Sequence, residues 1–159
     1  MNAGRLAGLF YLGTFATGII ALAAGTGMAA ANAIATVCYV GVTVLFYVIF
    51  RRVNPVLSAV AAVFSLAGCA VSALMAFHVP VPINPLALFG CYCILIGYLV
   101  AASTFMPRLL GIAMAIGGVS WLTFGVPAVA RALVPFNYAP GILAEGALTA
   151  WLLVKGARV

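Results

Sequence analysis

Long apolar runs fill this chain, and short clusters of proline, glycine, asparagine or basic residues separate them. The separators are "GTG" at 25–27, "RRVNP" at 51–55, "VPVPINP" at 79–85, "MPR" at 106–108 and "VPFNYAP" at 134–140. Such residues end helices or resist insertion into a bilayer. The runs that remain cover about 5–24, 30–50, 56–78, 86–105, 109–131 and 136–155. Each is close to the roughly 17–25 residues that a helix needs to cross a bilayer. The pattern therefore predicts an all-α, polytopic membrane protein, a bundle of six transmembrane helices.

The composition supports a membrane location. Of the 159 residues, 67% are hydrophobic and 5% are charged, whereas a soluble domain carries about 25% charged residues. The net charge is +6, but the basic residues are scattered between the apolar runs and form no patch for nucleic acid. Residues 1–159 are predicted to form one integral-membrane domain, with the lipid bilayer as its main partner.

The basic residues predict how the chain is threaded, because short cytoplasmic loops collect Lys and Arg. If the chain crosses the membrane six times, one side holds six basic residues: Arg5, Arg51, Arg52, Arg108, Lys155 and Arg158. The opposite side holds Arg131 alone. Both termini are therefore expected in the cytoplasm.

Small residues in the third run form a stripe suited to close helix contact. Ser58, Ser65 and Ser72 recur every seven residues, and Gly68 falls on the same side. In lipid, helices associate through close backbone approach and polar contacts. The stripe predicts a helix-packing seam, and similar grooves are expected at Gly90, Gly97, Gly111, Ala115 and Gly118.

Glu145 is the only acidic side chain, and it lies in the middle of the last apolar run. Ten residues separate it from Lys155, about 15 Å of helix, which is half of a hydrocarbon core of roughly 30 Å. Thr149 lies one turn later on the same face, which we expect to point into the bundle because a carboxyl exposed to lipid is costly. Arg131 and Tyr138, expected near the outer boundary, complete the candidate polar site.

Three roles remain open for the Glu145 carboxyl. It can pair with Arg131, directly or through water or a tyrosine. It can be protonated and hydrogen-bonded to a neighbouring helix. It can also serve as a proton or ligand site.

Other chemistry finds little support in the sequence. Cys91 and Cys93 form C-x-C on a predicted helix, which points their thiols to different faces, while Cys38 and Cys69 stand alone in other runs. His78 is the only histidine, so neither a zinc ligand set nor a nucleophile with an oriented base can be assembled. We expect no metal, no cofactor and no catalytic residue.

Four blocks of the chain carry a family resemblance. They are "RLAGLFYLGTFATGI", "FRRVNPVLSAVAAVF", "LFGCYCILIGYLVAASTFMPRLLGI" and "LAEGALTAWLLVKG". Their most specific parts are "GYL" followed by "F-x-PR-x-LG", and a Glu before "WLLVKG". The blocks resemble the bacterial integral-membrane family known as domain of unknown function 4386, of which this chain looks like a shortened member.

The resemblance implies six helices in a bacterial inner (plasma) membrane and supplies no known reaction. It places Arg5, Arg108 and Glu145 at positions typical of the family. Tyr92 stands where the family tends to have His in "FG-x-H", so a His-dependent activity is not expected in this chain.

Taken together, the sequence favours a non-catalytic structural or accessory subunit, or a lipid-interacting bundle, in a larger membrane complex or a homo-oligomer. A first alternative is a small transporter or channel component in which Glu145 binds a proton or cation. A second is a membrane-embedded enzyme acting on a lipid or quinone, with a polar pocket near Arg131, Tyr138 and Glu145. The observation that separates these classes is whether Glu145 lines a cavity open to water or is enclosed by side chains.

Overall fold

A computed structural model describes residues 2–23 and 28–157 of the chain. Within these residues the secondary structure is entirely helical, which confirms the predicted all-α class. The α-helices are α1 (Ala3–Ala23), α2 (Met28–Phe50), α3 (Pro55–Ala76), α4 (Pro85–Ala102), α5 (Arg108–Leu122), α6 (Pro127–Leu133) and α7 (Ala139–Val154). Two short 3-10 helices, η2 (Thr123–Gly125) and η3 (Phe136–Tyr138), precede α6 and α7. The predicted separator at 25–27 and the basic residue Arg158 lie outside the described residues.

Four segments of the described chain are long and apolar enough to cross a membrane. They are Ala30–Phe50, Pro55–Ala76, Pro85–Ala102 and Arg108–Gly125. The last helix, α7, has 16 residues and is therefore about 24 Å long. Length and composition thus indicate a membrane protein with four candidate spans.

The fifth predicted helix is interrupted. The sequence predicts one span over 109–131, but α5 ends at Leu122 and α6 begins at Pro127. Val126 between them is extended, with φ −118° and ψ 102°, as the residue before a proline prefers to be. Because Pro127 has no N–H and its ring would clash with the preceding turn, a single straight helix cannot run through it. Arg131 therefore lies on a separate short helix.

Two Asn-Pro pairs begin α3 and α4. The Asn54 side chain accepts a hydrogen bond from the Leu57 N–H at 3.0 Å, and the Asn84 side chain accepts one from the Leu86 N–H at 2.9 Å. Both asparagines are N-caps that satisfy a free N–H of the first turn. The proline that follows each occupies the first helical position, where its missing N–H is harmless.

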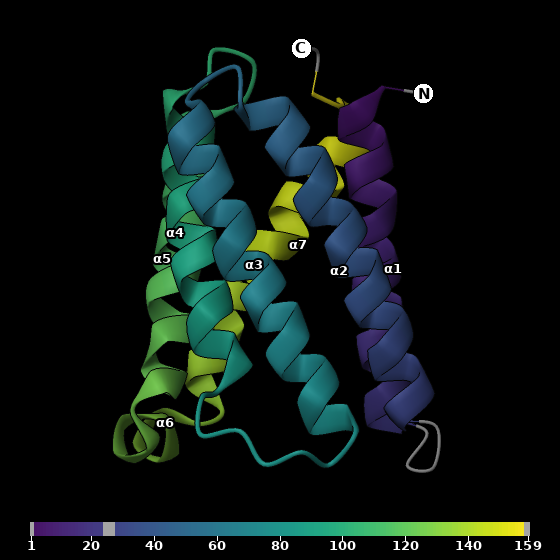
Figure 1. The fold of residues 1–159 in the computed structure, drawn as a ribbon. Coiled ribbons are helices and arrows are strands. Elements are labelled where there is room, and N and C mark those ends of the chain that lie inside the picture. Colours follow the sequence, from purple (N-terminus) through teal and green to yellow (C-terminus); the bar gives the residue numbers. More distant parts are fainter. Residues whose placement is uncertain (1, 24–27, 158–159) are drawn as a thin grey trace.

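The six long helices form a ring in which each helix packs against the next (Figure 1). Helix α7 closes the ring because it contacts α5 on one side and α1 on the other. The start of α1 and the end of α7 meet at one end of the ring, where the Arg5 guanidinium donates to the Val154 carbonyl at 3.2 Å. We call this the terminal end. The opposite end, with α6 and the α3–α4 connection, is the α6 end (Figure 1).

Helices α4 and α5 approach until their backbones touch at two glycine pairs. A Cβ on Gly97 would lie 2.6 Å from the carbonyl oxygen of Gly111, and a Cβ on Gly118 would lie 2.7 Å from that of Gly90. Neither distance leaves room for a side chain. These contacts confirm the small-residue grooves predicted in both helices and are the close backbone approach expected in lipid.

The small-residue stripe of α3 meets α2 through hydroxyl groups. Ser58 and Ser65 are both buried. The Ser58 hydroxyl donates to the Tyr47 carbonyl at 3.2 Å, and the Ser65 hydroxyl shares a short hydrogen bond with the Thr43 hydroxyl. These two serines therefore lie in the α2–α3 contact.

The same stripe meets α4 at Gly68. A Cβ there would lie 2.9 Å from the ring of Phe89, so the glycine makes room for that ring. Ser72, further along α3, is only partly buried and lines a cavity.

Candidate functional site

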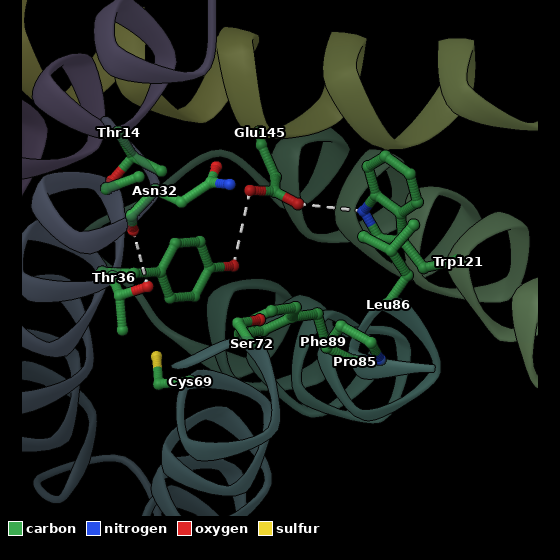
Figure 2. Close-up of a pocket in the computed structure, with 12 residues that line it drawn as sticks. Thr14, Asn32, Thr36, Cys69, Ser72, Pro85, Leu86, Phe89, Trp121 and Glu145 are labelled. Carbon is green, nitrogen blue, oxygen red and sulfur yellow. Dashed lines mark hydrogen bonds between the residues drawn. The ribbon is translucent and has the colours of Figure 1, made fainter. Parts of the chain in front are cut away.

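Glu145 lies on α7 with 8% of its surface exposed, and its carboxyl accepts three hydrogen bonds. Trp121 of α5 donates its Nε1–H to Oε1 at 2.9 Å. Tyr39 of α2 donates its hydroxyl to Oε2 at 3.4 Å, and the Cys93 thiol of α4 donates to Oε1 at 3.6 Å. Figure 2 shows the bond from Trp121. One carboxyl thus connects α7 to three other helices.

The residues one turn before and after Glu145 have different roles. A Cβ on Gly141 would collide with the indole of Trp121, so the glycine allows this ring to lie against α7. Thr149 is buried, and its hydroxyl donates to the backbone carbonyl of Glu145 at 2.7 Å. Thr149 therefore shares the interior face, as the sequence indicates, but contacts the backbone of Glu145 rather than its carboxyl.

Arg131 and Tyr138 do not contact the carboxyl. The direct Arg131–Glu145 pair considered from the sequence is not formed, because the helix break at Pro127 places Arg131 on α6, where it lines a separate cavity. Tyr138 packs against Trp121, with ring centroids 5.9 Å apart, and against Phe124 at 4.8 Å. Its contact with the site is therefore indirect, through the ring that donates to Glu145.

Glu145 also lines a cavity of about 380 Å³ (Figure 2). The lining residues come from all six long helices: Thr14, Asn32, Ala35, Thr36, Tyr39, Cys69, Ser72, Pro85, Leu86, Phe89, Trp121 and Glu145. Pro85 and Leu86 open α4 directly after the α3–α4 connection, so the cavity occupies the half of the ring nearer the α6 end. Asn32 is exposed and marks its rim, whereas the buried Glu145 marks its deep part. We call this space the Glu145 cavity.

Large side chains fill the ring beyond the Glu145 cavity. Those with less than 2% exposure are Tyr11, Val42, Phe46, Ile49, Phe50, Tyr92, Ile96, Leu99, Val100, Met114, Leu148 and Leu152. The ring of Tyr11 lies edge-on to Tyr39, with centroids 5.6 Å apart, and that of Tyr92 is edge-on to Tyr39 at 5.9 Å. The side of Tyr39 away from the cavity is therefore part of a packed aromatic core.

Three of the residues around the carboxyl were not identified from the sequence. Tyr39, Cys93 and Trp121 lie on three helices, so no spacing along the chain connects them with Glu145. One signal was available, because a tryptophan within an apolar run needs a partner for its indole N–H. Glu145 is the only carboxyl side chain that can serve as that partner.

The Glu145 cavity combines one carboxyl and three aromatic rings with the neutral polar side chains of Thr14, Asn32, Thr36 and Ser72. The described residues contain no group of three or more His, Cys, Asp or Glu side chains that could hold a metal ion. Tyr39, Phe89 and Trp121 supply the aromatic lining of the Glu145 cavity. The arrangement suits recognition of a positively charged or hydrogen-bonding group.

Fold and site together define a helical protein of membrane type with one acidic group in its interior. A family model described as "Domain of unknown function (DUF4386)" matches residues 74–156, more than half of the chain. The chain belongs to this family. The match includes the blocks around 88–112 and 143–156, whereas those at 5–19 and 50–64 lie outside it. No curated protein and no solved structure matches the chain.

Proposed function

We propose that the chain crosses a bacterial inner membrane six times, with both termini in the cytoplasm, and binds a small organic cation in the Glu145 cavity. Binding there is the first step of a small transporter. The helices of the ring run alternately toward and away from the α6 end, which supports six crossings (Figure 1). The described basic residues near the terminal end are Arg5, Arg51, Arg52, Arg108 and Lys155. By the positive-inside rule that end is cytoplasmic, and the cavity then faces the outside.

One observation carries the binding proposal: the only carboxyl side chain of the chain lines a cavity together with three aromatic rings. A carboxylate attracts a cation, and an aromatic face attracts one within about 6 Å of its centroid. The rings of Tyr39, Phe89 and Trp121 cannot replace the water shell of an inorganic ion. They favour a cation that carries its own apolar body.

The size and depth of the site agree with this role. The volume of about 380 Å³ lies within the range of roughly 300–1,000 Å³ typical of small-molecule sites. An ionisable group at membrane depth is expensive and usually marks a function. In this proposal the packed aromatic core closes the cavity toward the cytoplasm, so the structure corresponds to an outward-facing state.

The non-catalytic structural role, which the sequence alone favours, is the second candidate. The hydrogen bonds that hold α7 to α2, α4 and α5 through Glu145 support it. In that role the carboxyl serves folding alone. The membrane-embedded enzyme has less support, because Arg131 lines a different cavity from Glu145 and Tyr138 packs against aromatic rings.

Three probes of similar shape test the binding proposal: benzylammonium, benzyl alcohol and phenylacetate. Replacing Trp151 by Phe leaves Trp121, which lines the cavity, as the only tryptophan, so its fluorescence reports binding to the purified protein in detergent. We expect a saturable change with benzylammonium and none with phenylacetate. Glu145→Gln should weaken benzylammonium binding by at least about tenfold, or 1.4 kcal/mol. Equal binding of the alcohol and the ammonium, or an unaffected Gln variant, would refute a cation site.

A flux measurement separates binding from transport. Vesicles containing the protein should take up benzylammonium faster than empty vesicles, and Glu145→Gln should abolish the difference at unchanged melting temperature. Binding of benzylammonium without flux would support the cation site and contradict the transporter role. Loss of folding in the Gln variant, without binding in the native protein, would favour the structural role.

A further inference from the structure

A second cavity, of about 390 Å³, lies at the α6 end. It is formed where the α3–α4 connection meets the corner between η2 and α6. Ile83, Asn84, Phe124, Pro127 and Arg131 are among its lining residues. None of them lines the Glu145 cavity. We call this space the Arg131 cavity.

The polar groups that Arg131 and Asn84 offer to this cavity are hydrogen-bond donors. A guanidinium has five N–H donors and no acceptor. The Asn84 side-chain oxygen already accepts from the Leu86 N–H at 2.9 Å, which leaves its NH₂ group for a ligand. The only acidic side chain in the chain is Glu145. Its carboxyl accepts hydrogen bonds from Tyr39, Cys93 and Trp121, away from the Arg131 cavity. A cation and an amide N–H without a carboxylate favour an anion.

The surroundings of Arg131 are apolar and face outward. Helix α6 has no buried residue, and Val129, Leu133 and Phe136 are 41%, 42% and 80% exposed. In a membrane protein, exposed apolar side chains around a single basic one mark the boundary where acyl chains meet headgroups. Basic pockets between membrane helices on the cytoplasmic side bind lipid headgroups, and the charge-assisted pairing of Arg with phosphate is the same in either leaflet.

We infer that the Arg131 cavity binds the phosphate of an anionic phospholipid in the leaflet at the α6 end. Arg131 and the Asn84 amide hold the phosphate, while Ile83 and Phe124 contact the apolar part of the lipid. An anionic headgroup is preferred over a zwitterionic one, because no second acidic side chain is available to pair with an ammonium group. This inference does not depend on a ligand in the Glu145 cavity.

Lipid binding to the purified protein tests the inference. Phosphatidylglycerol, phosphatidylcholine and inorganic phosphate are added to the full chain in detergent, and bound lipid is counted by native mass spectrometry. Phosphatidylglycerol should bind most tightly, and Arg131→Gln should weaken it roughly fivefold, as expected for one basic residue at a lipid surface. Arg52→Gln, at the terminal end, is the matched control and should leave binding at the Arg131 cavity unchanged.

A second variant guards against misfolding. Asn84→Asp keeps an oxygen to cap α4 but places a carboxylate beside Arg131, so it should also weaken phosphatidylglycerol binding while the melting temperature is maintained. Unchanged binding in both variants would overturn the proposal. Equal affinity for phosphatidylcholine would overturn the preference for an anionic lipid. Competition by inorganic phosphate at the same concentration as the lipid would make this a free-anion site instead.

Discussion

The indole ring of Trp121 occupies the space that a side chain at position 141 would fill, so Gly141 is required for the contact between α5 and α7. One turn further along α7 the same indole donates a 2.9 Å hydrogen bond to Glu145. This is the shortest of the three bonds to the carboxyl. The glycine therefore controls the geometry of the site without contacting its polar atoms.

Replacing Gly141 by Ala should separate Trp121 from Glu145. We expect the free energy of unfolding to fall by about 1–3 kcal/mol, as for other overpacked cores, and the emission of Trp121 to change in the Trp151→Phe background. Gly146→Ala on the same helix is the control, since no atom lies within 4 Å of the added methyl. It should be neutral or stabilising by up to about 1 kcal/mol. Equal stability of the two variants would show that the Trp121 indole can pack against α7 without a glycine at position 141.

The glycine pair between α4 and α5 predicts a specific sensitivity. Gly97→Ala or Gly111→Ala should each destabilise the protein by about 1–3 kcal/mol, because the new methyl meets backbone atoms that cannot move aside. Together they should cost less than the sum, since both disrupt one contact. Denaturant unfolding in detergent measures this, with Gly18→Ala, which meets no atom within 4 Å, as control. Additive effects would mean that the two glycines act at separate contacts.

The hydroxyl contact between α2 and α3 predicts a small coupling. Thr43 donates its proton to the Tyr39 carbonyl at 2.9 Å, so Ser65 must donate to the Thr43 oxygen, since a hydroxyl carries a single proton. A double-mutant cycle with Thr43→Val and Ser65→Ala should give a coupling of about 0.6 kcal/mol, the average for such bonds in membranes. Thr17 bonds only to carbonyls of its own helix, so the cycle of Thr17→Val with Ser65→Ala should give none. A coupling energy of zero between Thr43 and Ser65 would show that their hydrogen bond does not contribute to the free energy of unfolding.

Two substitutions of Glu145 should differ in stability. Gln keeps an oxygen for the Trp121 N–H, whereas Ala leaves that buried donor without a partner. The Ala variant should therefore be less stable than the Gln variant by about 1–3 kcal/mol, measured by unfolding in the same detergent. If both melt together, the carboxyl does not hold the indole.

The proposed orientation predicts which positions react with a membrane-impermeant thiol reagent in whole cells. Single cysteines are introduced after Cys38, Cys69, Cys91 and Cys93 have been replaced. Positions 82 and 136, exposed at the α6 end, should be labelled from outside. Positions 52 and 104, exposed at the terminal end, should react only after the cells are opened. The reverse pattern would show that the chain has the opposite orientation in the membrane, with the Glu145 cavity facing the cytoplasm.

The sequence predicted helix positions better than helix continuity. Most of the connections between helices could be predicted because Asn-Pro pairs and charged residues interrupt the apolar runs. Helices α3 and α4 accordingly begin one residue before the predicted positions 56 and 86. The break at Pro127 was missed because residues 126–130 remain apolar on both sides of it. The sequence therefore places Arg131 at the outer end of one helix over 109–131, where pairing with Glu145 is one of the three roles left open.

The interior position of Glu145 could be predicted from the residues of its own helix, whereas its hydrogen-bond partners could not. A lone carboxyl between Gly141 and Thr149 indicates an inward face whatever the neighbours are. Tyr39, Cys93 and Trp121 meet it only because α7 closes a ring against α5 and α1, and a single sequence does not specify this order. The cavity has the same origin, since six helices contribute to its lining.

A protein with one acidic side chain has a simple vibrational spectrum in the carboxyl region. The C=O stretch of a protonated side-chain carboxylic acid has a single source, Glu145, and that band disappears when the proton leaves. Infrared difference spectra recorded with and without benzylammonium therefore read the state of this one group without any label, and Glu145→Gln supplies the blank. A carbodiimide that enters the bilayer likewise has one side chain to modify, and mass spectrometry of residues 139–154 would locate the adduct.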